Sequence, residues 1–168
     1  MASLLTVLQY SREHRPSNRR ILTKIGWTEQ YISAMENAVD VFSKDSQVYR
    51  VYLAISNGEA IGFLYVEYYA WNRLCQIQGL AVCPEFQRQG AASALVARAE
   101  DFARSRNARG VYVDTPVSNT GGRSFYEAIG YRFGYLMPHY YEDTLDGVTY
   151  HKFFHAIQAD ECGQTCSK

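Results

Sequence analysis

The sequence lacks a surplus of charge of either sign. Its 168 residues carry 17 Lys and Arg against 17 Asp and Glu, so the formal net charge at pH 7 is zero. A protein that binds nucleic acid or an anionic membrane through its overall field needs an excess of basic residues. We therefore expect neither nucleic acid nor a membrane among its partners.

Long apolar runs and cysteines are also scarce. The apolar stretch near the start, residues 4–8, is too short for a signal peptide or a membrane span, and no basic residue precedes it. Of the four cysteines, Cys75 and Cys83 stand in apolar contexts typical of buried thiols, while Cys162 and Cys166 stand in a polar tail without histidine. We expect a reduced, cytoplasmic protein that needs no metal.

What the sequence does contain is typical of one globular domain. A chain of 168 residues can bury a substantial core, and 47% apolar with 20% charged residues is an ordinary globular composition. No repeat or long linker divides it. We expect one domain over residues 1–157 and a disordered polar tail over residues 158–168.

Hydrophobic periodicity predicts an α/β fold. The expected strands cover residues 6–10, 48–55, 61–69, 74–82, 111–115, 131–137 and 148–154, and the expected helices cover residues 28–43, 91–106 and a short segment after Asn119. Asn57-Gly58 predicts a tight hairpin between the second and third strands. The strand–helix–strand order over residues 74–115 predicts a parallel pair. Residues 11–20 and 138–147 are interpreted as loops.

A polar loop with one glycine joins the expected buried strand at residues 74–82 to the helix that begins near Ala91. Its residues are Gln87, Arg88, Gln89 and Gly90, and the small residues Ala91, Ala92 and Ser93 follow. The unpaired N–H groups of a helix start attract phosphate, and Arg88 can add positive charge. The loop is neither a P-loop nor a dinucleotide fingerprint. On these residues alone, a phosphate site and an ordinary tight turn are equally good interpretations.

Two motifs in a fixed order resemble those of the GCN5-related N-acetyltransferase (GNAT) family. The first is Leu80-Ala81-Val82-x-Pro84-x-x-Gln87-Arg88-Gln89-Gly90-Ala91-Ala92, similar to the family's pyrophosphate-binding motif, with Ala92 where many members have glycine. The second is Asn119-x-x-x-x-Ser124-Phe125-Tyr126-x-x-x-Gly130-Tyr131. The resemblance covers about residues 48–154, whereas residues 10–47 carry no signature.

The resemblance implies a mixed, mostly antiparallel sheet that is splayed at its centre after a bulge near Gly79, with acetyl-CoA as cosubstrate. The amides of residues 88–93 would bind the pyrophosphate. Backbone amides near residues 80–82 would bind the pantetheine and the acetyl carbonyl, and Asn119 would bind the pantetheine arm. The residues expected at acetyl-CoA are thus Leu80, Ala81, Val82, Gln87, Arg88, Gln89, Gly90, Ala91, Ala92, Ser93, Asn119 and Tyr126.

The resemblance also implies direct attack by a primary amine in a ternary complex. Tyr126 matches the family's general acid, because a phenol with a reference pKa of about 10 can protonate a leaving thiolate; the alternative is a packed aromatic ring. Asp114 matches by spacing the base of the ribosomal-protein N-terminal acetyltransferases, and a carboxylate capping the next turn is the equal alternative. Glu67 faces either the acceptor cleft or bulk water. Gln76, where histone-type members carry a glutamate, cannot act as a base.

The acceptor side is the least readable part of the chain. Tyr140 and Tyr141, in an acidic stretch, match tyrosines that hold the acceptor backbone in peptide-acetylating members, although a solvated loop explains them too. Trp27 and Tyr31 are candidates for the acceptor wall, and for Tyr31 core packing is the favoured interpretation. The acceptor is a protein N-terminus, a lysine or a small amine. The competing hypothesis is an acyl-CoA-binding sensor without catalysis, and either a monomer or a homodimer is compatible with the sequence.

Overall fold

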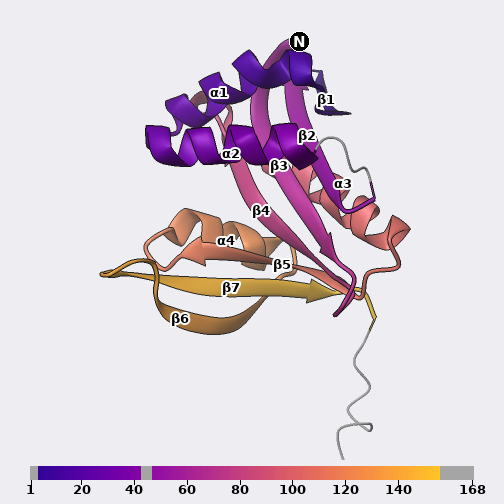
Figure 1. The fold of residues 1–168 in the computed structure, drawn as a ribbon, viewed down its shortest axis with the longest axis vertical. Helices are drawn as coiled ribbons and strands as arrows, with labels where there is room; N and C mark the ends of the chain where they lie inside the picture. The colour runs from indigo at the N-terminus through magenta and orange to yellow at the C-terminus, as the bar shows by residue number, and fades with distance from the viewer. Residues whose placement is uncertain (1–3, 43–46, 156–168) are drawn as a thin grey trace, which may run out of the picture.

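The computed structural model describes residues 4–42 and 47–155 (Figure 1). In chain order the elements are β1 (Leu5–Gln9), the 3-10 helix η1 (Arg12–His14), α1 (Arg15–Lys24), α2 (Glu29–Phe42), β2 (Tyr49–Ser56), β3 (Glu59–Tyr69), β4 (Leu74–Val82), the 3-10 helix η2 (Pro84–Phe86), α3 (Ala91–Ser105), β5 (Gly110–Pro116), α4 (Thr120–Ala128), β6 (Arg132–Glu142) and β7 (Leu145–Phe153). The expected tail over residues 158–168, Cys162 and Cys166 lie outside the described residues.

The strands form one seven-stranded sheet in the order β1-β2-β3-β4-β5-β7-β6. Every neighbouring pair is antiparallel except β4 and β5, which are parallel. The parallel pair follows from the right-handed crossover through α3, as the strand–helix–strand order predicts. The hairpin between β2 and β3 turns at Asn57 and Gly58, both with positive φ (49° and 81°), as a tight two-residue turn requires. The predicted mixed, mostly antiparallel sheet is confirmed.

The sheet parts at its centre. Tyr65 of β3 pairs with Gly79 and the next residue, Val66, pairs with Ile77, so Gln78 is an extra residue that forms a bulge in β4. Strands β4 and β5 pair only over residues 74–77 and 110–113. Beyond these pairs the two strands diverge, and the sheet has the form of a V (Figure 1). The predicted splay after a bulge near Gly79 is confirmed.

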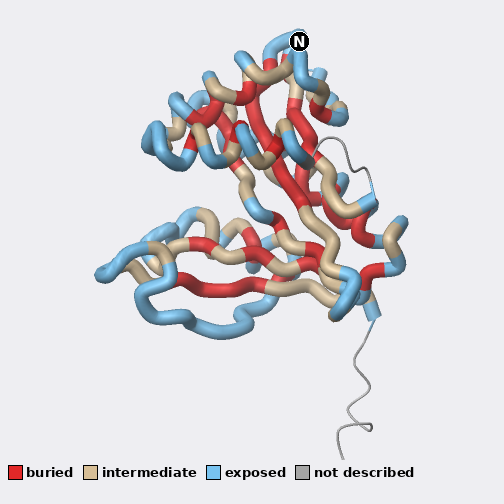
Figure 2. Tube along the Cα trace, viewed as in Figure 1, coloured by how far each residue is buried: buried red, intermediate tan, exposed pale blue. Residues whose placement is uncertain are grey.

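Each face of the sheet carries its own hydrophobic core. Helices α1 and α2 cover one face of the β1–β4 half, and α3 covers the other (Figure 1). Under α1 and α2 lie the buried side chains of Ile21, Leu22, Ile32, Val39, Val51, Leu53 and Phe63. The core under α3 and α4 includes Leu64, Ile77, Leu95, Val96, Phe102, Val111, Tyr126 and Tyr150. The buried stretches follow the middle of the strands, whereas β6 is exposed along its length (Figure 2).

The loop expected at residues 11–20 is wrong. This segment forms η1 and most of α1, with Pro16 in the first turn, where its missing N–H costs nothing. Few of the side chains in this segment face the core. Ile21 and Leu22, which follow it in α1, are buried. The arginines pair instead with α2, because Arg15 and Arg19 both contact Glu36. A helix stabilised by ion pairs to another helix leaves little hydrophobic periodicity to read.

The loop expected at residues 138–147 is also wrong in its extent. Strand β6 continues through Tyr140 and Tyr141 to Glu142, and β7 begins at Leu145. The pairing with β7 is interrupted between Met137 and Glu142, where His139 has a positive φ of 55°. Because β6 is an edge strand, it tolerates Pro138 and this irregular stretch. The polar composition of residues 138–142 predicted a loop where the structure has the end of β6.

Candidate active site

The loop before α3 has the backbone of an anion site. Gly90 is the N-cap of α3 with φ 88°, and Arg88 also has a positive φ of 61°. A side chain at Gly90 would meet nothing within 4 Å, so the glycine is required by its backbone conformation and the space beside it is open. Gly90 offers no side chain to cap the first N–H groups of α3. These groups remain suitable for an anionic ligand.

The glutamines of this loop bind the backbone of the loop itself. Gln87 Nε2 donates to the carbonyl of Val82 at 3.1 Å, and Gln89 Nε2 donates to the carbonyl of Glu85 at 3.0 Å. Arg88 is exposed and makes no ion pair within residues 4–42 and 47–155. Ala91 is buried, Ala92 is half-buried and Ser93 is exposed. The glutamine side chains thus fix the loop, and Arg88 is the positive charge at its surface.

The predicted pantetheine residues lie on the parted edge of β4. Leu80, Ala81 and Val82 pair with β3 on one side, and on the other side they lie beyond the last residue that pairs with β5. Asn119 stands opposite, at the start of α4. Its Oδ1 accepts from the Gly122 amide at 3.0 Å, and its Nδ2 donates to Thr115 Oγ1 at 2.9 Å. The Asn119 side chain therefore joins the end of β5 to the first turn of α4.

Tyr126 lies in an aromatic cluster under α4. Its ring centroid is 5.2 Å from that of Phe125, 5.6 Å from that of Tyr131 and 6.2 Å from that of Tyr150. Burial raises the pKa of Tyr126 above its ordinary value, and nearby Tyr141 adds to the rise. The phenol is therefore protonated at neutral pH and can only donate a proton there. Both interpretations of the ring, packing and acid, are compatible with this position.

Asp114 is the centre of a set of hydrogen bonds that arrive from three other strands. Its Oδ2 accepts from Gln76 Nε2 at 2.8 Å and from the Tyr140 hydroxyl at 3.4 Å, and its Oδ1 accepts from Thr149 Oγ1 at 2.5 Å. The side chain is half-buried, and within the described ranges no Lys, Arg or His forms an ion pair with it. These bonds come from side chains across the sheet rather than from the backbone of the following turn.

Glu67 belongs to the same group of polar side chains. Its Oε2 accepts from the Tyr69 hydroxyl and from Gln78 Nε2, both at 2.9 Å. Gln76 connects this carboxylate to Asp114, since the Tyr69 hydroxyl lies 3.2 Å and Gln78 Nε2 lies 3.0 Å from Gln76 Oε1. The two predicted carboxylates are therefore brought together by hydrogen bonds through neutral side chains.

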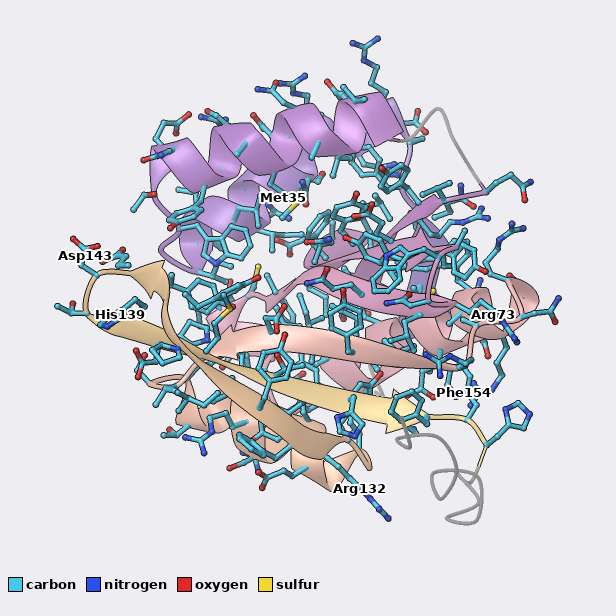
Figure 3. All side chains as sticks on the ribbon, turned by 60° about the horizontal axis from the view of Figure 1, so that its bottom comes forward. Met35, Arg73, Arg132, His139, Asp143 and Phe154 are labelled. Atoms are coloured by element: carbon cyan, nitrogen blue, oxygen red, sulfur yellow. The ribbon has the colours of Figure 1, made fainter. Side chains whose placement is uncertain are left out.

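Aromatic side chains from both arms of the V lie around this group. Tyr140 and Tyr141 pack edge to face with their centroids 4.9 Å apart, and Tyr140 reaches Asp114. A side chain added at Gly79 would lie 3.1 Å from Met35 Cε and 3.6 Å from Trp27 Cη2, so both residues lie over the bulged part of β4. Met35 points from α2 toward the strands (Figure 3).

The core position expected for Tyr31 is wrong. Its side chain is 49% exposed. Burial raises the pKa of Tyr141, with Asp114, Tyr140 and then Tyr31 adding to the rise, so Tyr31 of α2 lies near Tyr141 of β6. Tyr31 therefore does not belong to either core.

Two further findings concern the kind of site. Among residues 4–42 and 47–155, no group of three or more His, Cys, Asp and Glu side chains is arranged to hold a metal ion. None of the helices in these ranges has the length and apolar character needed to cross a membrane.

Comparison with known proteins decides the family. A model of the acetyltransferase (GNAT) family matches residues 10–131. The chain belongs to the GNAT family. The match begins at residue 10, so it includes α1 and α2, for which the sequence motifs gave no signature.

Relatives and solved structures agree with this assignment. A streptothricin acetyltransferase from Streptomyces lavendulae is 30% identical over 96 residues, which are 56% of this chain and 51% of that protein. The chain thus spans about half the length of this curated relative. A GNAT-family structure from Desulfovibrio desulfuricans superposes with a TM-score of 0.81 at 18% identity, covering 89% of this chain and 99% of the other.

One of the similar structures holds the expected cosubstrate. A Bacillus anthracis protein of the streptothricin acetyltransferase type, solved in complex with acetyl coenzyme A, superposes with a TM-score of 0.63 at 21% identity over 68% of this chain and 70% of the other. In this GNAT chain, the open space at Gly90 and the unpaired edge of β4 fit a pyrophosphate followed by a pantetheine arm.

Several residues of this GNAT site carried no functional signal in the sequence. Thr149 and Met35 read as ordinary strand and helix residues, and Gln76 was noted only because it cannot be a base. The sheet order places β7, which carries Thr149, beside β5. Met35 of α2 lies over the bulge of β4. The signal that could have found them is the register of the strands around Asp114.

Proposed function

We propose that the protein transfers the acetyl group of acetyl-CoA to a primary amine, with Asp114 as the base and Tyr126 as the acid. The observation that carries this proposal is the position of Asp114. It is the first residue of β5 beyond the pairing with β4, and among the described residues only neutral donors hold its carboxylate. A half-buried carboxylate without a cationic partner is suited to receive a proton or an ammonium group.

The chemistry is a single displacement. Acetyl-CoA supplies a thioester whose carbonyl carbon bonds to the amine nitrogen while its carbon–sulfur bond breaks. Asp114 accepts the proton that the amine nitrogen loses, directly or through one water. Tyr126, which burial keeps protonated at neutral pH, donates its phenolic proton to the departing sulfur. It then regains a proton from solvent while Asp114 releases the one it accepted. The products are an N-acetylated amine and coenzyme A.

The surroundings of Asp114 favour a cationic acceptor. Glu67 and Asp114 supply two carboxylates, and Trp27, Tyr140 and Tyr141 supply aromatic faces that attract ammonium groups. A protein N-terminus, a lysine side chain and a small amine all meet this description. The streptothricin acetyltransferases among the relatives add streptothricin to the acceptors worth testing.

A thiol-release assay tests the proposal. Acetyl-CoA is offered with streptothricin, an alanine-started peptide, Nα-acetyl-lysine amide and cadaverine. We expect turnover with at least one of them, and a loss of about 100-fold or more in kcat for Asp114→Asn. Binding of coenzyme A without turnover of any acceptor would instead support the competing hypothesis of an acyl-CoA sensor.

A further inference from the structure

The geometry points to Gln76 as a positioning residue that holds Asp114 in its ionised form and in one orientation. This inference rests on the proposed function, in which Asp114 is the base. Gln76 does not take part in proton transfer, because a carboxamide is neither acid nor base at ordinary pH. It acts through its amide group, which donates to Asp114 Oδ2 at 2.8 Å.

The neighbours of Gln76 fix which end of its amide faces Asp114. Three polar groups lie within hydrogen-bond distance of Gln76 Oε1. They are Gln78 Nε2 at 3.0 Å, the Tyr112 hydroxyl at 3.1 Å and the Tyr69 hydroxyl at 3.2 Å. Turning the amide over would place its NH2 group against the NH2 group of Gln78 and its carbonyl against the Asp114 carboxylate. The surrounding strands therefore present an N–H group to Asp114 and no alternative.

The other groups that face Asp114 give it no positive charge. Tyr112 lies on its own strand, Tyr140 and Tyr141 come from β6, Thr149 comes from β7, and Glu67 lies on β3 beyond Gln76. None of these described groups is a cation. Hydrogen bonds from neutral donors are therefore the interactions that favour the ionised carboxylate, and the donor from Gln76 is the shorter of the two to Oδ2.

This arrangement also explains why an amide suits position 76 in this chain. A carboxyl group there would stand within hydrogen-bond distance of Asp114, and two carboxylates so close cannot both ionise at low cost. An amide keeps the same shape, adds a donor and leaves a single base. Gln76→Met removes the donor, and Gln76→Glu adds a second carboxyl group beside Asp114. Because Gln76 is half-buried, the fold can accept either substitution.

The first experiment measures the pKa of Asp114 by carboxyl ¹³C NMR in the protein without ligands, with the resonance assigned by Asp114→Asn. We expect the pKa to rise in Gln76→Met, because a donor to the charged form is lost. A larger rise of about one unit or more is expected in Gln76→Glu, because a like charge is added. Gln78→Glu is the matched control. Gln78 is also a β4 amide; it donates to Glu67 and to Gln76 Oε1 but makes no direct contact with Asp114, so a smaller shift is expected.

The second experiment follows kcat against pH for the acceptor of the panel above that turns over fastest, with acetyl-CoA and acceptor both saturating. The acidic limb reports the base in the ternary complex. It should move to higher pH in the order Gln78→Glu, Gln76→Met, Gln76→Glu, while melting temperatures stay close together.

Two results would overturn the inference. One is an Asp114 pKa that is unchanged in both Gln76 variants, and the other is a Gln78→Glu shift as large as that of Gln76→Glu. The proposed function fails separately, if Asp114→Asn keeps the activity and the acidic limb of the wild type. Because the NMR titration needs no turnover, it decides the role of Gln76 in either case.

Discussion

At the scale of single residues, Tyr126 combines a packing role with a proposed chemical role. Its ring contacts three other aromatic rings, and it is only 5% exposed. Its hydroxyl makes no hydrogen bond within the described part of the chain. Packing therefore depends on the ring, whereas acid catalysis depends on the hydroxyl, and the two roles can be separated by removing one oxygen atom.

Tyr126→Phe should lower kcat by about 100-fold or more, because general acid catalysis typically contributes at least this much. Its melting temperature should change little. Tyr150→Phe is the matched control: Tyr150 is also fully buried, but its hydroxyl donates to Glu127 at 2.8 Å and accepts from Arg123 at 3.3 Å. That variant should lose about 1 kcal/mol of unfolding free energy and keep its activity. Full activity in Tyr126→Phe would remove the acid from the proposal.

At the scale of elements, helices α1 and α2 are joined by charged side chains. Glu36 of α2 is 6% exposed and accepts from Arg19 Nη1 at 2.7 Å, with Arg15 Nη2 at 3.6 Å. Both arginines are about two-fifths exposed, so their charges are partly solvated. Glu36 is thus the buried end of a cluster whose other members reach water.

Glu36→Gln should lower the free energy of unfolding by about 1–2 kcal/mol in urea titrations, because a charge-assisted bond at a buried carboxylate is lost. Glu29→Gln provides the comparison. Glu29 also pairs with Arg19, but it is 69% exposed, and an exposed pair of this kind contributes less than about 1 kcal/mol. Equal losses in the two variants would contradict a special role for the buried carboxylate.

The same elements show what the sequence can and cannot predict. Asn57-Gly58, Gly90 and the Asn119 cap are local signals, and the turns and helix starts that they predict are all present. Helix α1 was not predicted because its first residues are mostly polar and form ion pairs with α2 instead of a hydrophobic stripe. The site shows the same division: Asp114 and Tyr126 stand in readable motifs, whereas the partners of Asp114 come from strands whose register no local pattern encodes.

At the scale of the whole molecule, the fold raises the pKa of many tyrosines. The chain has 14 tyrosines, and many of them have a pKa above the ordinary value, chiefly because burial disfavours the phenolate. For Tyr112, burial and then the charge of Asp114 raise the pKa to about 12. A phenol with a raised folded-state pKa stabilises the fold below the unfolded value of about 10 and loses that contribution as pH rises through the folded value.

The tyrosine contribution to the free energy of unfolding should therefore be constant up to about pH 9 and fall between about pH 10 and pH 12. Absorbance of the phenolate at 295 nm should rise in two steps. Exposed phenols titrate near the ordinary value of about pH 10, and the buried ones titrate only as the protein unfolds. In concentrated urea the two steps should merge near pH 10. A single step near pH 10 with an intact fold would contradict the expectation.

The parting of β4 and β5 also bears on where the sheet exposes unpaired backbone groups. Strand edges with unpaired backbone groups are the places where sheets of different molecules join and aggregate. This protein has such edges in the middle of its sheet, along residues 78–82 of β4 and 114–116 of β5. Each faces the other arm of the V and does not lie on an outer edge of the sheet. The fold can therefore keep backbone donors unpaired for a slender ligand away from the outer edges, where strands of other molecules join most readily.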